Sequence, residues 1–232
     1  MTLLGASLAF IFLIAVLGAI RTRLLFEFVS ISLLLFKTQS VGKWFYSLVF
    51  LPGTILHELS HWLTAELLGV RTGEIIILPS FEDPVNGGRE KLGSVQTEKT
   101  GPLRSFLIGA APFFTGVFIL WLLGTLLQND RLWWQYFLIF YGVVVVGSSM
   151  LLSREDRNSW PFIGILFFLI IATLYLTPLD LPLAWIVTIT AIVWSLNQIL
   201  GVTVLAILAI IGLTYGMRRI IERIVGKKIV RR

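Results

Sequence analysis

Residues Phe50–Val70 read FLPGTILHELSHWLTAELLGV, an apolar stretch that is interrupted by His57, Glu58 and His61. The chain has 2 histidines, and both lie in this stretch. Ionisable side chains are costly inside a membrane segment, so their presence there favours a functional role over a packing role. At about 100° per residue, His57 and His61 lie one turn apart on the same face of a helix.

The spacing H-E-x-x-H is typical of a zinc site on a helix. The two imidazoles can converge on one metal ion, and the glutamate lies beside its open coordination position. We therefore predict Zn²⁺ as the cofactor, with His57 and His61 as metal ligands. Glu58 is the predicted catalytic residue, acting as general base on a water molecule that the metal activates.

The composition around this segment is that of a membrane protein. The chain has 232 residues, of which 56% are hydrophobic and 14% are charged, and its mean hydropathy is +0.88. Soluble domains carry about 25% charged residues. The expected fold is an all-α multi-pass protein of the cell membrane, with about six to eight transmembrane helices. Because the chain has no cysteine, disulfides and thiolate metal ligands are excluded.

Apolar segments predict the positions of the membrane helices, at 3–20, 24–36, 44–70, 103–127, 132–152, 161–177 and 183–217. The last segment is long enough to be one tilted helix, two connected helices, or one span with an interfacial extension. The organisation that we predict consists of N-terminal membrane helices, a core, C-terminal membrane helices and a basic cytoplasmic tail, at 1–43, 44–160, 161–217 and 218–232.

Basic residues predict the orientation of the chain in the membrane. They follow the first apolar segment at Arg21 and Arg23, and they recur in 71–104, in 153–160 and in the tail. Loops rich in Lys and Arg tend to be cytoplasmic, which places the N-terminus outside and the C-terminus in the cytoplasm. The tail is expected to touch anionic lipid headgroups of the bilayer. A nucleic-acid partner is not expected, since no basic domain with interleaved aromatic residues is present.

The longest polar stretch, 71–101, predicts a small cytoplasmic β-hairpin. Its parts EIIIL and GSVQT are β-rich, and the residues from Pro79 to Gly88 are typical of a turn region. The stretch is too short to form an independent soluble domain. Its exposed edge is expected to hold an extended substrate by strand addition.

From about residue 48 to 160 the chain resembles the site-2 proteases and related intramembrane zinc metalloproteases. The resemblance consists of the HELSH helix, a hairpin with GVRTGEIIILP and GSVQ, and a following helix with GAAPFFTG at 109–116. Family members have a G-P-x-x-N-like element in that helix. Here Ala111-Pro112 stands where Gly-Pro would stand, and Thr115 stands in place of Asn. The resemblance implies a zinc-dependent peptidase.

The resemblance also implies a carboxylate as third metal ligand, from an L-D-G-like motif that this chain lacks. Asp156 in SREDRNSW is the preferred candidate, and Asp180 in TPLDLPL and Glu155 are the alternatives. Leu179-Asp180 is closer to the family's Leu-Asp. However, His61 is about nine residues, or roughly 14 Å, from the predicted cytoplasmic end of its helix, and Asp156 lies at that same face.

These observations predict an intramembrane endopeptidase that cleaves membrane-protein or peptide substrates. The alternative is a metal-binding membrane protein without proteolytic activity, such as a transporter or a scaffold that has lost catalysis. A transporter is expected to carry acidic or polar residues on several membrane helices. Few such residues occur outside the H-E-x-x-H motif and its candidate partner, which favours the peptidase.

Overall fold

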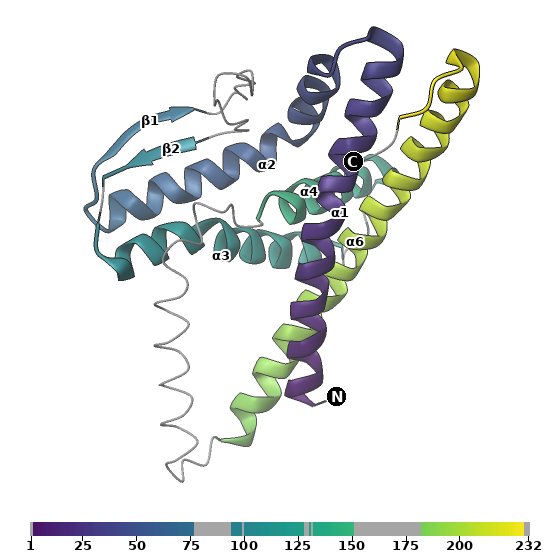
Figure 1. Cartoon of the computed structure of the whole chain (residues 1–232). Coiled ribbons are helices and arrows are strands. Elements are labelled where there is room, and N and C mark those ends of the chain that lie inside the picture. The colour runs from purple at the N-terminus through teal and green to yellow at the C-terminus, as the bar shows by residue number, and fades with distance from the viewer. Residues whose placement is uncertain are drawn as a thin grey trace.

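The computed structural model describes residues 2–76, 94–98, 100–127, 130, 132–150 and 182–229. This part of the chain forms five helices and one pair of β-strands (Figure 1). The elements are α1 (Leu3–Phe36), α2 (Ser40–Leu67), β1 (Thr72–Ile76), β2 (Ser94–Thr97), α3 (Pro102–Leu126), α4 (Trp133–Ser149) and α6 (Leu183–Val225). The predicted helical architecture with a small hairpin is confirmed.

The expected number of six to eight transmembrane helices is wrong. Among the described helices, α1, α3 and α6 are long and apolar enough to cross a membrane, a pattern that is typical of a membrane protein. Helix α2 is 28 residues long but carries the charged and histidine side chains of the 50–70 stretch, and α4 has only 17 residues. The predicted segment at 161–177 lies outside the described residues.

The first two predicted segments form one continuous helix, α1, of 34 residues. The predicted break near residue 22 is absent because Arg23 continues the helix and its guanidinium pairs with Glu27 one turn later, at 2.8 Å. The helix ends at Phe36, and the capping residue Lys37 has a left-handed φ of 58°. Arg21 and Arg23 therefore lie within a helix and not in a loop that follows the first membrane span.

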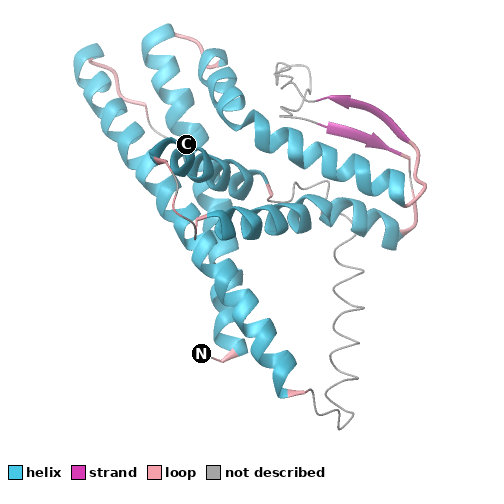
Figure 2. Cartoon of the chain, turned by 180° about the vertical axis from the view of Figure 1, so that it is seen from behind, coloured by secondary structure: helices cyan, strands magenta, loops and turns pink. Residues whose placement is uncertain are grey.

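Helix α6 is a single helix of 43 residues, which decides between the three alternatives for this segment. It runs parallel to α1 along most of its length (Figures 1 and 2). The Asn197 side chain donates to the Ala6 carbonyl at 2.8 Å, and Arg218 donates to Glu27 at 2.6 Å. Ala6 and Glu27 are as far apart along α1 as Asn197 and Arg218 are along α6. The two hydrogen bonds therefore fix how the two helices are aligned along their length.

A buried ionic cluster joins α1 to the end of α6. The carboxylate of Glu27 is fully buried, and Arg218 is 5% exposed. The Arg218 guanidinium bonds Glu27 through Nε and Glu222 through Nη1, each at 2.6 Å. The Ile229 amide also donates to Glu222, at 3.1 Å, which holds the chain that follows Gly226 against α6. Each buried carboxylate thus has a cationic partner, as buried charges require.

Helices α2, α3 and α4 pack on one another beside the α1–α6 pair. They approach closely at two glycines. A Cβ on Gly53 of α2 would lie 2.7 Å from the Val145 carbonyl of α4, and one on Gly116 of α3 would lie 2.4 Å from Met150. The Tyr141 hydroxyl of α4 donates to the Val49 carbonyl of α2 at 2.6 Å. These contacts bring the end of α4 close to the middle of α2.

The predicted hairpin is confirmed as an antiparallel pair, with Ile75 opposite Val95. The first strand begins at Thr72, two residues before the predicted EIIIL run. The hairpin lies along α2 (Figure 2), and the Thr72 hydroxyl donates to the Glu66 carboxylate of that helix at 2.9 Å. The segment between the strands lies outside the described residues.

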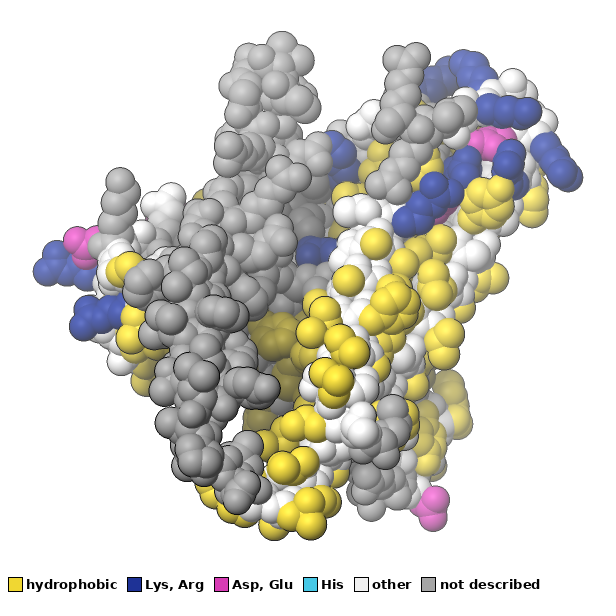
Figure 3. Space-filling view, turned by 60° about the horizontal axis from the view of Figure 1, so that its bottom comes forward, with side chains coloured by type: hydrophobic (Ala, Val, Ile, Leu, Met, Phe, Trp, Pro, Cys, Tyr) yellow, Lys and Arg dark blue, Asp and Glu magenta, His cyan; other side chains and the backbone are white. Residues whose placement is uncertain are grey.

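The surface separates apolar and basic side chains. Hydrophobic side chains cover much of the long helices, whereas Lys and Arg gather where α6 ends (Figure 3). The exposed cations at this end are Arg219, Arg223, Lys227 and Lys228. An apolar helix surface with cations at one terminus is the pattern of a helix that enters a membrane and stops at the headgroup layer.

Candidate metal centre

Helix α2 places both histidines on one face, as the spacing predicts. His57 and His61 lie one turn apart, and their Nε2 atoms are 3.2 Å from each other. The ring planes are nearly perpendicular, at 83°, so the rings meet at their Nε2 edges without stacking. His61 is buried, whereas His57 is partly exposed.

The Nδ1 atom of each ring faces a backbone carbonyl from another helix. His57 Nδ1 lies 2.7 Å from the Ser149 oxygen at the end of α4, and His61 Nδ1 lies 2.7 Å from the Ile108 oxygen in α3. A carbonyl oxygen only accepts hydrogen bonds, so each Nδ1 carries the proton. This is the arrangement by which proteins orient metal-binding histidines.

With both protons on Nδ1, the two Nε2 atoms present lone pairs to each other. Such lone pairs repel each other, and a cation between them, a metal ion or a proton, removes this repulsion. In a tetrahedral site with Zn–N distances of 2.0–2.1 Å, two ligand nitrogens are about 3.3 Å apart. The observed separation of 3.2 Å therefore fits zinc, and the residues that the structure describes here suit two of its ligands.

Glu58, the predicted general base, follows His57 on α2 and is buried, with 6% of its surface exposed. Glu66, the other carboxylate in the second half of α2, is exposed and accepts its hydrogen bond from Thr72 of the hairpin. The two glutamates of this helix therefore lie in different surroundings, and only Glu58 is adjacent to the histidine pair.

The third predicted ligand is not within the described part of the chain. Asp156 and both alternatives, Asp180 and Glu155, lie outside the described residues. Among the residues that are described, no group of three His, Cys, Asp or Glu side chains is placed to hold a metal ion. The assignment of the third ligand thus stays a prediction.

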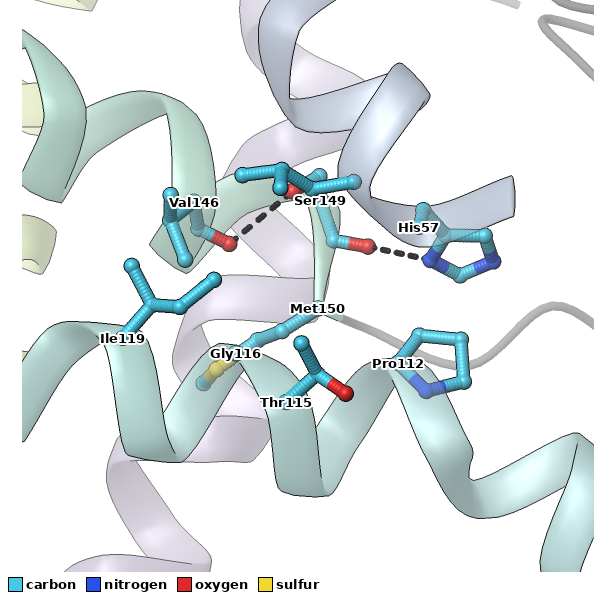
Figure 4. A pocket seen from close by; sticks show the side chains of 9 residues that line it. His57, Pro112, Thr115, Gly116, Ile119, Val146, Ser149 and Met150 are labelled. Atoms are coloured by element: carbon cyan, nitrogen blue, oxygen red, sulfur yellow. Dashed lines mark hydrogen bonds between the residues drawn. The ribbon is translucent and has the colours of Figure 1, made fainter. Parts of the chain in front are cut away.

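A small cavity of about 10 Å³ lies beside His57, between α2, α3 and α4 (Figure 4). Its walls include Pro112 and Thr115 of α3, and Ser149 and Met150 at the end of α4. A cavity of this size is just large enough to hold one water molecule. The structure therefore brings the Ala111-to-Thr115 element, noted in the sequence for its resemblance, next to the first histidine.

Sequence patterns did not predict the two carbonyl acceptors. Any residue type can supply a backbone oxygen, so Ser149 and Ile108 carry no side-chain signal of their role. The proline four residues after Ile108 was the one available hint, since proline leaves the i−4 carbonyl without its helical donor.

Comparisons with protein-family models, with curated proteins and with solved structures found no match to this chain.

Proposed function

We propose that this chain is an intramembrane zinc-dependent endopeptidase that cleaves membrane-associated protein substrates. The observation that carries the proposal is the histidine pair: two Nε2 atoms 3.2 Å apart, each on a ring that is oriented through Nδ1 by a backbone carbonyl. A buried imidazole needs an acceptor in any role, but here both acceptors turn the rings so that their Nε2 atoms meet, as one metal ion requires. In this proposal His57, His61 and Asp156 hold the metal.

The described neighbours of the candidate third ligands favour Asp156. The Ser149 carbonyl contacts His57, and Asp156 follows Ser149 by seven residues. Asp180 instead precedes Pro182, the residue that caps the start of α6. That end of α6 lies away from α2 (Figure 1). Because Ser149 already contacts His57, only a short segment of chain is needed to bring the Asp156 carboxylate to the histidines.

Glu58 supplies the proton transfers of the proposed reaction. A bound zinc ion lowers the pKa of water and polarises the substrate carbonyl. Glu58 accepts the proton of the attacking water as a new C–O bond forms at the peptide carbon. It then gives that proton to the peptide nitrogen as the C–N bond breaks, which releases a carboxylate and an amine. The cavity beside His57 has room for one water molecule next to the first predicted metal ligand.

The hairpin is the proposed holder of the substrate. An α-helix keeps its carbonyls in internal hydrogen bonds, so a helical membrane substrate must become extended before cleavage. A free edge of the β1–β2 pair can bind such a segment by strand addition. The hairpin lies along the helix that carries the histidines, which supports this role.

The proposed orientation keeps the C-terminus in the cytoplasm and the N-terminus outside. Its support is the group of exposed cations where α6 ends, Arg219, Arg223, Lys227 and Lys228, which suits the anionic cytoplasmic leaflet. The hairpin and the tail are proposed to lie on that same side.

The proposal is tested by Glu58→Gln in purified protein in detergent micelles. Zinc is measured by elemental analysis, and cleavage is measured on a panel of fluorescently labelled single-span model substrates. We expect one zinc per chain in both the wild type and the variant. Cleavage by the variant should fall by about 10²-fold or more, since the general base is lost while the metal ligands remain.

Glu66→Gln is the matched control, because it makes the same chemical change on the same helix. Its amide oxygen can still accept the Thr72 hydrogen bond, so zinc content and cleavage should stay at the wild-type level. A wild-type protein that binds no zinc contradicts the proposal. A Glu58→Gln variant that cleaves as fast as the wild type contradicts the role of Glu58 as general base. A wild type that binds zinc but cleaves no substrate contradicts the peptidase assignment and supports metal binding without proteolysis.

A further inference from the structure

Pro112 lies inside α3, where proline is ordinarily unfavourable. Proline has no N–H to donate to the carbonyl four residues earlier, and its ring pushes that carbonyl away from the helix axis. The carbonyl that loses its helical partner here belongs to Ile108. It is the same oxygen that lies 2.7 Å from His61 Nδ1.

Ile108 is 6% exposed, so water does not readily replace the missing donor. A buried carbonyl without a donor is destabilising, and in apolar helices a neighbouring side chain usually satisfies a carbonyl that proline has freed. The His61 ring is that neighbour. The proline and the histidine thus satisfy each other's requirement: one exposes an acceptor, and the other supplies the donor.

We propose that Pro112 is a positioning residue for the metal centre. By removing the helical partner of the Ile108 oxygen, it makes this oxygen the acceptor that holds His61 with its proton on Nδ1 and its Nε2 toward His57. The Ser149 oxygen is available to His57 for a different reason, because it lies at the end of α4. The functional meaning of this inference rests on the zinc peptidase proposed above.

The test is Pro112→Ala in the full chain, labelled with ¹⁵N-histidine and studied without metal in detergent micelles. The chain has 2 histidines, so the nitrogen spectrum contains two rings only. In the wild type we expect both rings to carry the proton on Nδ1. In the variant, position 112 gains a backbone N–H that draws the Ile108 oxygen back into the helix. His61 should then become a mixture of tautomers, while His57 stays unchanged.

Zinc affinity gives a second measurement on the same proteins. Loss of an orienting partner of a metal-binding histidine typically weakens metal affinity by about 10–100-fold, and we expect the zinc dissociation constant of Pro112→Ala to rise by this factor. Alanine is a better helix former than proline, so α3 itself should be retained.

Pro102→Ala is the matched control, since Pro102 occupies the first turn of the same helix. The N–H groups in the first turn of a helix have no helical acceptor. A backbone N–H gained at position 102 therefore leaves the hydrogen bonds of the α3 carbonyls unchanged. Both histidine rings and the zinc dissociation constant should match the wild type.

Two results would overturn the role of Pro112. One is a Pro112→Ala protein in which His61 keeps its proton on Nδ1 and zinc binds as tightly as before. The other is a simultaneous change of both rings, which means a general loss of the site instead of the loss of one acceptor. A wild type whose rings both carry Nδ1 protons but which binds no zinc rejects the proposed peptidase, and the tautomer of His61 in the variant still decides the role of Pro112.

Discussion

At the residue scale, the candidate centre depends on side chains that are each fixed by two constraints. His57 and His61 share a helical face through their spacing, and each ring is oriented by a carbonyl from a different helix. Glu58 follows His57 directly and is buried, so its carboxylate lies close to the histidine pair. The two rings are therefore oriented before any metal or substrate binds, which favours metal affinity.

The third ligand gives a prediction at this scale. Asp156→Ala should reduce the bound zinc from one per chain to near zero at micromolar zinc, because a site with two nitrogen ligands binds far more weakly than a site with three protein ligands. Competition with a chromophoric chelator measures the loss. Asp180→Ala and Glu155→Ala are the matched carboxylate controls and should keep their zinc. Loss of zinc in Asp180→Ala, with zinc retained in Asp156→Ala, would move the ligand to Asp180.

At the scale of elements, the centre exists because α2, α3 and α4 approach closely. Gly53 of α2 lies against the last turn of α4, and that turn supplies the Ser149 carbonyl to His57. Pro112 and Thr115 bring α3 to the same point (Figure 4). A helix pair that is held apart by even one methyl group would carry the carbonyl away from the imidazole.

Gly53→Ala tests this dependence. Its Cβ would lie 2.7 Å from both the Val145 carbonyl and the Ser149 hydroxyl, so the two helices must separate. We expect a loss of about 1–3 kcal/mol in the free energy of unfolding, the usual cost of overpacking, together with weaker zinc binding. Denaturant titration in micelles and chelator competition measure the two effects.

Gly18→Ala is the control for the glycine substitution, because an added Cβ there meets nothing within 4 Å. It should leave zinc binding unchanged and stabilise α1 by up to about 1 kcal/mol, the helix-propensity difference between the two residues. Equal behaviour of the two variants would show that the α2–α4 approach does not control the site.

At the scale of the whole molecule, α1 and α6 form a parallel pair against which the other helices pack. One hydrophobic core includes residues of all five described helices, and the Glu27–Arg218–Glu222 cluster closes the pair at the end where α6 stops. Because the Ile229 amide also bonds Glu222, the start of the basic tail is held at this end.

Removal of the shared cation is the prediction at this scale. Arg218→Ala leaves the carboxylates of Glu27 and Glu222 buried without this partner, and breaking a buried ion pair in this way costs about 3–5 kcal/mol. Denaturant titration in micelles measures the change in unfolding free energy. Arg219→Ala is the control: this side chain is 52% exposed, so its loss should cost less than about 1 kcal/mol. Similar losses for the two variants would contradict a structural role for the cluster.

Helix α1 shows why hydropathy alone did not predict where the long helices begin and end. Hydropathy predicts breaks wherever charged residues appear, yet Arg23 and Glu27 continue α1. Glu27 pairs with Arg23 one turn away and with Arg218, which is far away in the chain. From the sequence alone, a charged residue in a helix whose ionic partner is distant in the chain cannot be told from a charged residue in a loop. The number of spans was consequently overestimated.

Composition and short-range spacing were enough to predict the apolar helices, the hairpin and the shared face of His57 and His61, because these signals act within one element. The three-dimensional packing was needed to show which carbonyls orient the histidines, how closely α2 and α4 approach, and that Arg218 pairs with Glu27. These features join residues that are up to 191 positions apart in the chain, and no local pattern encodes a partner at such a distance.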